Sequence, residues 1–127
     1  MGAPVIPRPV RPILGLLSRQ PDLFTLAAER AAERWGAPDL ESDLFDFTFT
    51  DYYAREMGGD LKRRFLSFAF PMDPADLAEV KLWTNRIEQE IAAARPGPFP
   101  RPINLDPGYL NDSKLVLAST KDHAHRI

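Results

Sequence analysis

Hydrophobic and polar positions recur along the chain with two different periods, which predict an order of strands and helices. The apolar run Ile13–Ser18 is typical of a buried strand, and Gly15 within it allows the backbone to be approached closely. The next segment, Pro21–Trp35, has apolar residues at helical spacing and begins with proline, which is favoured at the first helical position. We therefore expect a strand followed by an amphipathic helix that ends at Gly36.

The middle of the chain changes to a period of two. Leu44–Phe49 alternates, with Phe45, Phe47 and Phe49 on one face, and Leu61–Phe70 places Leu66, Phe68 and Phe70 on one face. Each stretch therefore predicts a strand whose phenylalanines are interpreted as core. Between them, Thr50–Met57 predicts a short helix that ends at Gly58.

The clearest helix signal begins at Asp73 and Pro74, as N-cap and first helical residue. Apolar and small residues at helical spacing predict its buried stripe: Leu77, Val80, Thr84, Ile87 and Ile91. Lys81, Asn85 and Glu88 form a polar stripe beside it.

The last quarter of the chain contains two further strand candidates. Asn104–Asp106 predicts a short strand, the following Pro107-Gly108 fits the centre of a type II turn, and Leu115–Thr120 is apolar on both faces, as in a central strand. The resulting order, β-α-β-β-α-β, is that of an α+β ferredoxin-like (split βαβ) sandwich. We expect a mixed sheet with two helices on one face.

Composition narrows the class of protein. The chain of 127 residues fits one domain, which we expect over residues 13–127 behind a proline-rich arm at residues 1–12. Cysteine is absent, which excludes disulfides and cysteine nucleophiles, and the net charge of −2 gives no overall attraction to nucleic acid or anionic membrane. No apolar run approaches the roughly 18 residues of a membrane helix, and residues 1–12 contain prolines where a signal peptide would have an apolar segment. We expect a cytoplasmic protein without a membrane partner.

Five stretches of the sequence resemble one protein family. They are T-D-Y-Y-A-R-E-M-G at 50–58, L-K-R-R-F-L-S-F at 61–68, L-W-T-N-R-I-E at 82–88, N-L-D-P-G-Y-L at 104–110 and S-K-L-V-L-A-S-T-K-D-H-A-H-R-I at 113–127. Together they resemble the prokaryotic family called domain of unknown function 4416, from about Pro9 to the end. The resemblance implies no established activity. Since family members run on into further strands, it implies that the domain is incomplete at its C-terminal end.

Standard motifs for nucleotide and metal chemistry do not match. The chain lacks the phosphate-binding G-x-x-x-x-G-K-[ST] and the dinucleotide fingerprint G-x-G-x-x-G, and in Thr120-Lys121-Asp122 the aspartate comes one place too early for a guanine-reading motif. His123 and His125 could share a strand face and bind a metal, but Lys121 on that face would repel a cation. We expect no metal site, and the sequence identifies no cofactor.

Basic and amide residues nevertheless predict a site for a small anionic ligand, such as a nucleotide or a phosphorylated metabolite. The ligand-binding candidates are Lys121, Arg126, Lys114, Lys81, Asn85 and Asn104. His125 and Asp106 are candidates for proton transfer, although His125 could equally be bonded to backbone and Asp106 could simply accept turn N–H groups. The triplet Lys62-Arg63-Arg64 is either a solvated strand start or part of the same pocket. Whether the protein is an enzyme is left open.

The alternative is a non-enzymatic interaction module. A ferredoxin-like sheet can associate at its edge, so a homo-oligomer or a protein partner is compatible with the sequence. RNA binding through the sheet is disfavoured, because the phenylalanines of 45–49 and 66–70 are interpreted as core and the net charge is slightly negative.

Overall fold

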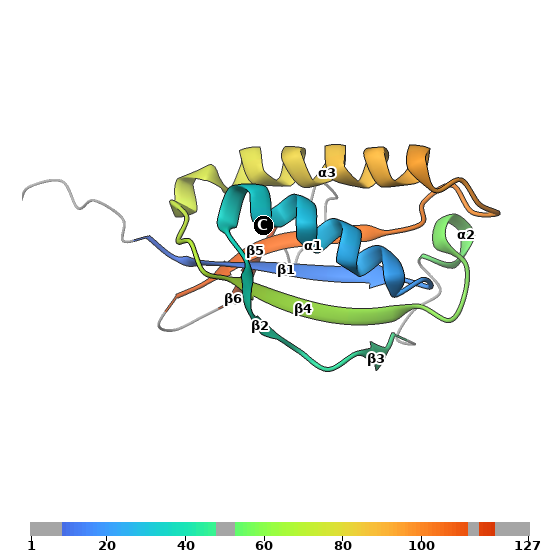
Figure 1. Cartoon of the computed structure of the whole chain (residues 1–127), viewed down its shortest axis with the longest axis horizontal. Helices are drawn as coiled ribbons and strands as arrows, with labels where there is room; N and C mark the ends of the chain where they lie inside the picture. The colour runs from blue at the N-terminus through green and yellow to red at the C-terminus, as the bar shows by residue number, and fades with distance from the viewer. Residues whose placement is uncertain (1–8, 48–52, 112–114, 119–127) are drawn as a thin grey trace, which may run out of the picture.

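Two long helices cover one face of an antiparallel sheet in the computed structural model, which describes residues 9–47, 53–111 and 115–118 (Figure 1). The elements are β1 (Arg11–Ser18), α1 (Asp22–Trp35), β2 (Pro38–Glu41), β3 (Phe45–Asp46), α2 (Ala54–Met57), β4 (Lys62–Phe68), the 3-10 turn η1 (Pro74–Asp76), α3 (Leu77–Ala94), β5 (Asn104–Leu110) and β6 (Leu115–Leu117). The α+β class is as predicted. Among the described residues, no helix has the length and apolar character needed to cross a membrane.

The central strand is β1, in the order β2-β4-β1-β5-β6, with β3 paired to β4 beside β2. All pairings among the described strands are antiparallel, so the expected mixed sheet is wrong. The reason is that each long helix joins strands that are not neighbours. Helix α1 leads from β1 to β2, which lies beyond β4, and α3 leads from β4 to β5, which lies beyond β1.

Both long helices follow their predicted apolar stripes. Helix α1 buries Phe24, Ala27, Ala31 and Trp35, and α3 buries the five residues of its expected stripe together with Lys81. They pack on alternate residues of the central strands, among them Leu14, Leu16, Leu66, Phe68 and Leu105. The start of α3 is also as predicted, since the Asp73 carboxylate accepts the Ala75 N–H at 2.9 Å, although its first turn is 3-10.

The chain does not turn at Pro107-Gly108, because β5 runs straight through both residues. The Pro107 carbonyl points to the outer edge of β5, away from β1, and accepts the Ala118 N–H at 2.9 Å. The N and O atoms of one residue lie on the same side of an antiparallel strand, so the missing N–H of Pro107 removes no bond to β1. At Gly108 an added Cβ would lie 1.9 Å from the Val116 carbonyl oxygen. This glycine therefore serves close strand contact, not a type II turn.

The last strand was expected in the centre of the sheet, but β6 lies at the end of the described strand order. Its residue Leu115 is exposed. The central place belongs to β1, whose residues from Pro12 to Ser18 are all buried. Ser119 and Thr120 lie outside the described residues.

The phenylalanine-rich strands are only partly core. Phe45, in the two-residue strand β3, is exposed, and Phe70 lies exposed beyond the end of β4. Strands β2 and β3 together form one interrupted edge along β4, and Ser42 bridges the gap through hydrogen bonds with the Phe65 backbone. Strand β2 escaped prediction because its four residues are all exposed, so no apolar pattern marks them. Of the expected helix Thr50–Met57, the described part is α2.

Candidate functional site

Charged and amide side chains surround the first residues of β5 on both of its sides, and we call them the β5-edge cluster. Its members come from α2, β4, α3, the connector before β5 and β5 itself: Glu56, Arg63, Lys81, Glu88, Arg101, Asn104 and Asp106. Segments far apart in sequence thus meet around the start of one strand.

The inner end of the cluster is the ion pair between Arg63 and Asp106. Arg63 Nη1 lies 3.2 Å from Asp106 Oδ2, and both side chains are buried. The register places Asp106 opposite Gly15, and Gly15 opposite Phe65, on the sheet face away from the helices. A Cβ at Gly15 would lie 3.0 Å from Arg63 Nη1. The glycine therefore leaves room for the Arg63 guanidinium to cross β1. The sequence predicted that another group would approach the Gly15 backbone closely, and that group is the Arg63 side chain.

Two aromatic rings lie close to the Arg63 guanidinium. Its Cζ lies 5.3 Å from the centroid of Phe47 and 5.4 Å from that of Phe65. Cation–π contacts of this kind are strongest where the cation is shielded from water, as Arg63 is here. The arginine is thereby fixed in orientation toward Asp106.

On the other side of β5, two side chains of α3 bind the backbone of Leu105. The Leu105 N–H donates to Glu88 Oε2 at 2.7 Å, and Lys81 Nζ donates to the Leu105 carbonyl at 2.8 Å. These groups point to the outer edge of β5, beyond the last described bond to β6 at Pro107. Lys81 and Glu88 are two helical turns apart and face the same way. Together they bond the outward-facing N–H and C=O groups of Leu105, as a neighbouring strand would.

Asp106 also accepts a hydrogen bond from its own strand and lies near a cation of α3. Asn104 Nδ2 donates to Asp106 Oδ2 at 3.0 Å, and Lys81 Nζ lies 4.0 Å from Asp106 Oδ1. Since Asp106 lies within a strand, its interpretation as a turn acceptor is wrong.

At the outer end, Arg101 connects the cluster with the surface. Its guanidinium donates to Glu56 at 2.8 Å, to Glu88 at 3.4 Å and to Asn104 Oδ1 at 2.6 Å. Its side chain is 26% exposed and that of Glu56 is 50% exposed. Burial favours the neutral form of Arg101, but its hydrogen bond to Glu56 and the charge of Glu88 outweigh this, so the pKa is raised and the group stays charged.

The carboxyl group of Glu88 is perturbed in the direction that favours its neutral form. Burial raises the pKa of Glu88, although the Leu105 N–H and the charges of Lys81 and Arg101 act against the rise. The negative charge of Asp106 adds to it. A buried carboxyl group with a raised pKa takes up a proton at a higher pH than an exposed one.

The structure brings together three of the predicted site residues, Asp106, Lys81 and Asn104. Asn85 lies half-buried on α3 between Lys81 and Glu88. The remaining candidates lie outside the described residues: His125, Lys121, Arg126 and Lys114.

Of the basic triplet Lys62-Arg63-Arg64, only the middle residue belongs to the β5-edge cluster. Lys62 pairs with Asp46, and Arg64 pairs with Glu41 at 2.9 Å. Sequence reasoning did not assign Glu88 and Arg101 to the site. The spacing of Glu88 from Lys81 was a usable signal, whereas Arg101 lies in a proline-rich connector without periodicity.

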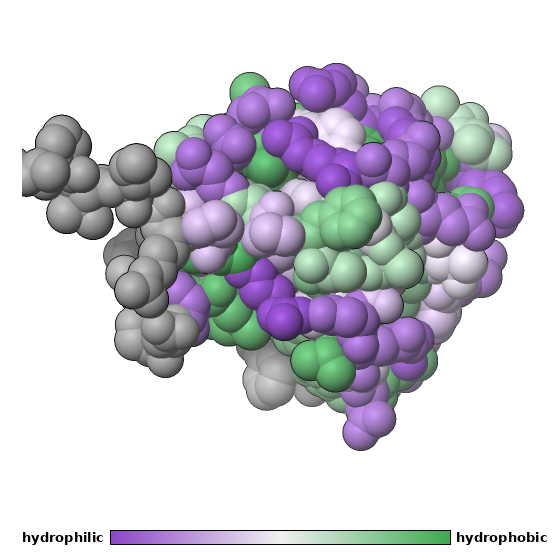
Figure 2. Space-filling model, turned by 60° about the vertical axis from the view of Figure 1, so that its left-hand side comes forward, coloured by the Kyte–Doolittle hydropathy of each residue, from purple (hydrophilic) through white to green (hydrophobic). Residues whose placement is uncertain are grey.

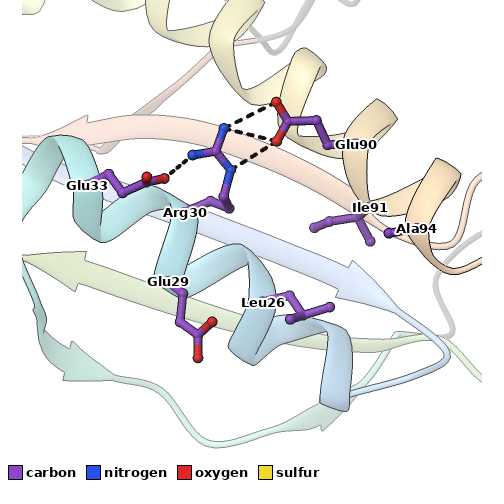
Figure 3. A pocket seen from close by; sticks show the side chains of 7 residues that line it. All are labelled: Leu26, Glu29, Arg30, Glu33, Glu90, Ile91 and Ala94. Atoms are coloured by element: carbon purple, nitrogen blue, oxygen red, sulfur yellow. Dashed lines mark hydrogen bonds and ion pairs between the residues drawn. The ribbon is translucent and has the colours of Figure 1, made fainter.

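A depression lies between α1 and α3, away from the β5-edge cluster, with a volume of about 460 Å³. It is lined by Leu26, Glu29, Arg30, Glu33, Glu90, Ile91 and Ala94 (Figure 3). Figure 3 shows Arg30 turned toward Glu90, to which it donates at 2.9 and 3.2 Å, and it also pairs with Glu33. These charges are on the surface, so this groove is a weaker candidate than the buried β5-edge cluster.

The sequence matches the family described as "Domain of unknown function (DUF4416)" over residues 8–127. The chain belongs to this family. The match covers every member of the β5-edge cluster and confirms the resemblance seen in the sequence. No match is found among curated proteins or among solved structures. The description of the family names no activity, so function has to be argued from the cluster itself.

Proposed function

We propose that the protein binds a small anionic ligand, a nucleotide or a phosphorylated metabolite, at the β5-edge cluster. The convergence of Lys81, Asn104 and Asp106 with Arg63 and Arg101 supports this proposal. Guanidinium, ammonium and amide donors are the groups that proteins use to bind phosphate and carboxylate.

The anion enters at the outer end of the cluster, where Arg101 and Glu56 meet solvent. Arg101 is charged, partly exposed and already oriented by Asn104. An incoming phosphate takes over the contact that the more exposed Glu56 makes with it. Lys81 lies deeper and adds a second positive charge near the carboxylates of Glu88 and Asp106.

A thermal-shift screen of the protein with nucleotides and phosphorylated metabolites tests the proposal. A ligand at about 100 times its Kd stabilises a protein by about 2.7 kcal/mol, which corresponds to a rise in Tm of several degrees. We expect Arg101→Gln to abolish the shift. The sequence predicts the same for Lys121→Ala and Arg126→Ala, at positions outside the described residues.

Arg30→Gln is the matched control, because Arg30 is also a partly exposed arginine with two carboxylate partners, but lies outside the cluster. It should keep the full ligand-induced shift. A complete screen in which no compound stabilises the protein would overturn the proposal.

We also infer that the fold is ferredoxin-like, as the sequence suggested. The order β2-β4-β1-β5 supports this, because each β-α-β unit then has one strand of the other unit inserted between its own two. Strands β3 and β6 are additions at the margins. A crystal structure of a family member with a different order of these four strands would reject the inference.

Self-association through the sheet is a second candidate function. The strand register places Leu40, Phe45, Leu110 and Leu115 on the face away from the helices, and these side chains are 38–68% exposed. Exposed apolar residues that share one face are typical of an interaction surface. By contrast, the side of the molecule in Figure 2 carries its hydrophobic residues in separate groups between hydrophilic ones.

A further inference from the structure

One carboxyl group of the β5-edge cluster is placed where it can control the charge of the site. The Glu88 side chain is only 14% exposed. Its Oε2 accepts the Leu105 N–H at 2.7 Å, and its Oε1 lies 3.4 Å from Arg101 Nη2. The charged groups that face it are Lys81 on α3, Arg101 on the connector and Asp106 on β5, with Glu56 of α2 on the other side of Arg101.

The charges of the described cluster balance when all groups are ionised. Three cations, Arg63, Lys81 and Arg101, oppose three carboxylates, Glu56, Glu88 and Asp106, which gives a net charge of zero. The described groups by themselves therefore exert no net attraction on an approaching anion. If Glu88 takes up a proton, the net charge becomes +1, and Arg101 loses one of its two carboxylate partners.

We propose that anion binding at the β5-edge cluster is coupled to protonation of Glu88, so that the site takes up one proton from solvent with each anion and binds more tightly as the pH falls. This rests on the proposed function. The proton goes to Oε1, and Oε2 continues to accept the Leu105 N–H, so the edge of β5 stays bound. Arg101 then donates to the ligand from Nη2 in place of Glu88, in addition to the Nη1 contact that the ligand takes over from Glu56.

Glu88 is better placed for this role than the other two carboxylates. Asp106 accepts from both Arg63 and Asn104 and lies near Lys81, deep inside the cluster and away from the outer end where the anion enters. Glu56 is half exposed, so solvent stabilises its charge. Glu88 combines burial with a single cation, Arg101, within hydrogen-bond distance among the residues that the structure describes.

Isothermal titration calorimetry with sulfate as the probe measures the coupling directly, because sulfate keeps its charge over the range used. Titrations at about pH 5.5 and about pH 7.5, each in two buffers of different ionisation enthalpy, give the number of protons taken up. We expect an uptake approaching one proton per sulfate at the higher pH. The affinity should fall by up to about tenfold per pH unit above the pKa of Glu88.

Glu88→Gln assigns the proton. The amide keeps an oxygen for the Leu105 N–H but carries no charge, so this variant should bind sulfate with the same affinity at both pH values and without proton uptake. Glu90→Gln is the matched control, since Glu90 is also a glutamate of α3 but pairs with Arg30 on the surface. It should behave as the wild type.

The possible failures are distinct. If wild-type protein binds no sulfate at either pH, the anion site and the coupling are both overturned. If it binds sulfate equally at both pH values without proton uptake, the coupling is overturned and the anion site stands. If proton uptake persists in a folded Glu88→Gln variant, the proton belongs to another group. The wild-type titrations decide the first two points even if the variant does not fold.

Discussion

Gly108 of β5 lies so close to β6 that a side chain cannot be accommodated. An added Cβ would come within 1.9 Å of the Val116 carbonyl oxygen, which belongs to the backbone of the paired strand. We expect Gly108→Ala to force β6 away and to lower the free energy of unfolding by about 1–3 kcal/mol, as overpacking does. Urea denaturation followed by circular dichroism measures this change.

Gly97 provides the control for that substitution. A Cβ at Gly97 would meet nothing within 4 Å, and its φ is outside the left-handed region. Gly97→Ala should therefore be neutral or stabilising by up to about 1 kcal/mol, because alanine restricts the unfolded chain. Equal stability of the Gly108 and Gly97 variants would contradict the close contact.

At the same scale, some site residues could be predicted and others could not. Lys81 and Glu88 follow from helical spacing, which is a local property. Arg63 and Asp106 are 43 positions apart in the sequence. Their pairing depends on the space that Gly15 leaves on the strand between them. No local pattern contains that information. The prediction of a turn at Pro107-Gly108 was wrong because both residues are paired within β5, although this dipeptide usually favours a turn.

The start of α3 depends on one side chain at the scale of the element. Asp73 Oδ1 accepts the Ala75 N–H at 2.9 Å and so satisfies one of the first free N–H groups of the helix. We expect Asp73→Ala to reduce stability by about 1 kcal/mol in urea denaturation. Asp73→Asn keeps the acceptor and should stay within a few tenths of a kcal/mol of the wild type. If both substitutions cost the same, the cap contributes nothing and the negative charge is what matters.

Elements were predicted well where burial imposes a period. The long helices α1 and α3 each bury one stripe, so their sequences show it. Edge strands are under no such constraint. Strand β2 is exposed throughout, and β6 is short and at the margin of the described sheet, so composition alone placed it wrongly in the centre.

For the molecule as a whole, the order of helices and strands indicated an α+β sandwich, but the direction of the strands required knowledge of which ones are neighbours. That knowledge comes from packing. Alternate residues of β1, β4 and β5 supply the apolar face on which both helices lie. The opposite face carries the Arg63–Asp106 pair in its interior and exposed apolar side chains toward its margins. The two faces therefore differ in what they can bind.

Association of two copies through the exposed apolar side chains of that face would bury leucines that now contact water. Burial of one leucine contributes about 1.5–3 kcal/mol, whereas a lysine in its place would have to lose its hydration. Leu115→Lys should therefore weaken a dimer at least about tenfold, since tenfold corresponds to 1.4 kcal/mol. Size-exclusion chromatography with light scattering over a range of concentrations measures the dissociation constant.

Leu82→Lys is the control for this test, because Leu82 is also an exposed leucine but lies on α3 in the helical layer. It should leave the dimer unchanged. Leu40→Lys, at the opposite margin of the sheet face, distinguishes loss of a contact from damage to β6. A wild-type protein that is monomeric at every concentration would exclude association of two copies through this face. The anion site would be unaffected, because the β5-edge cluster is complete within one chain as far as its described residues extend.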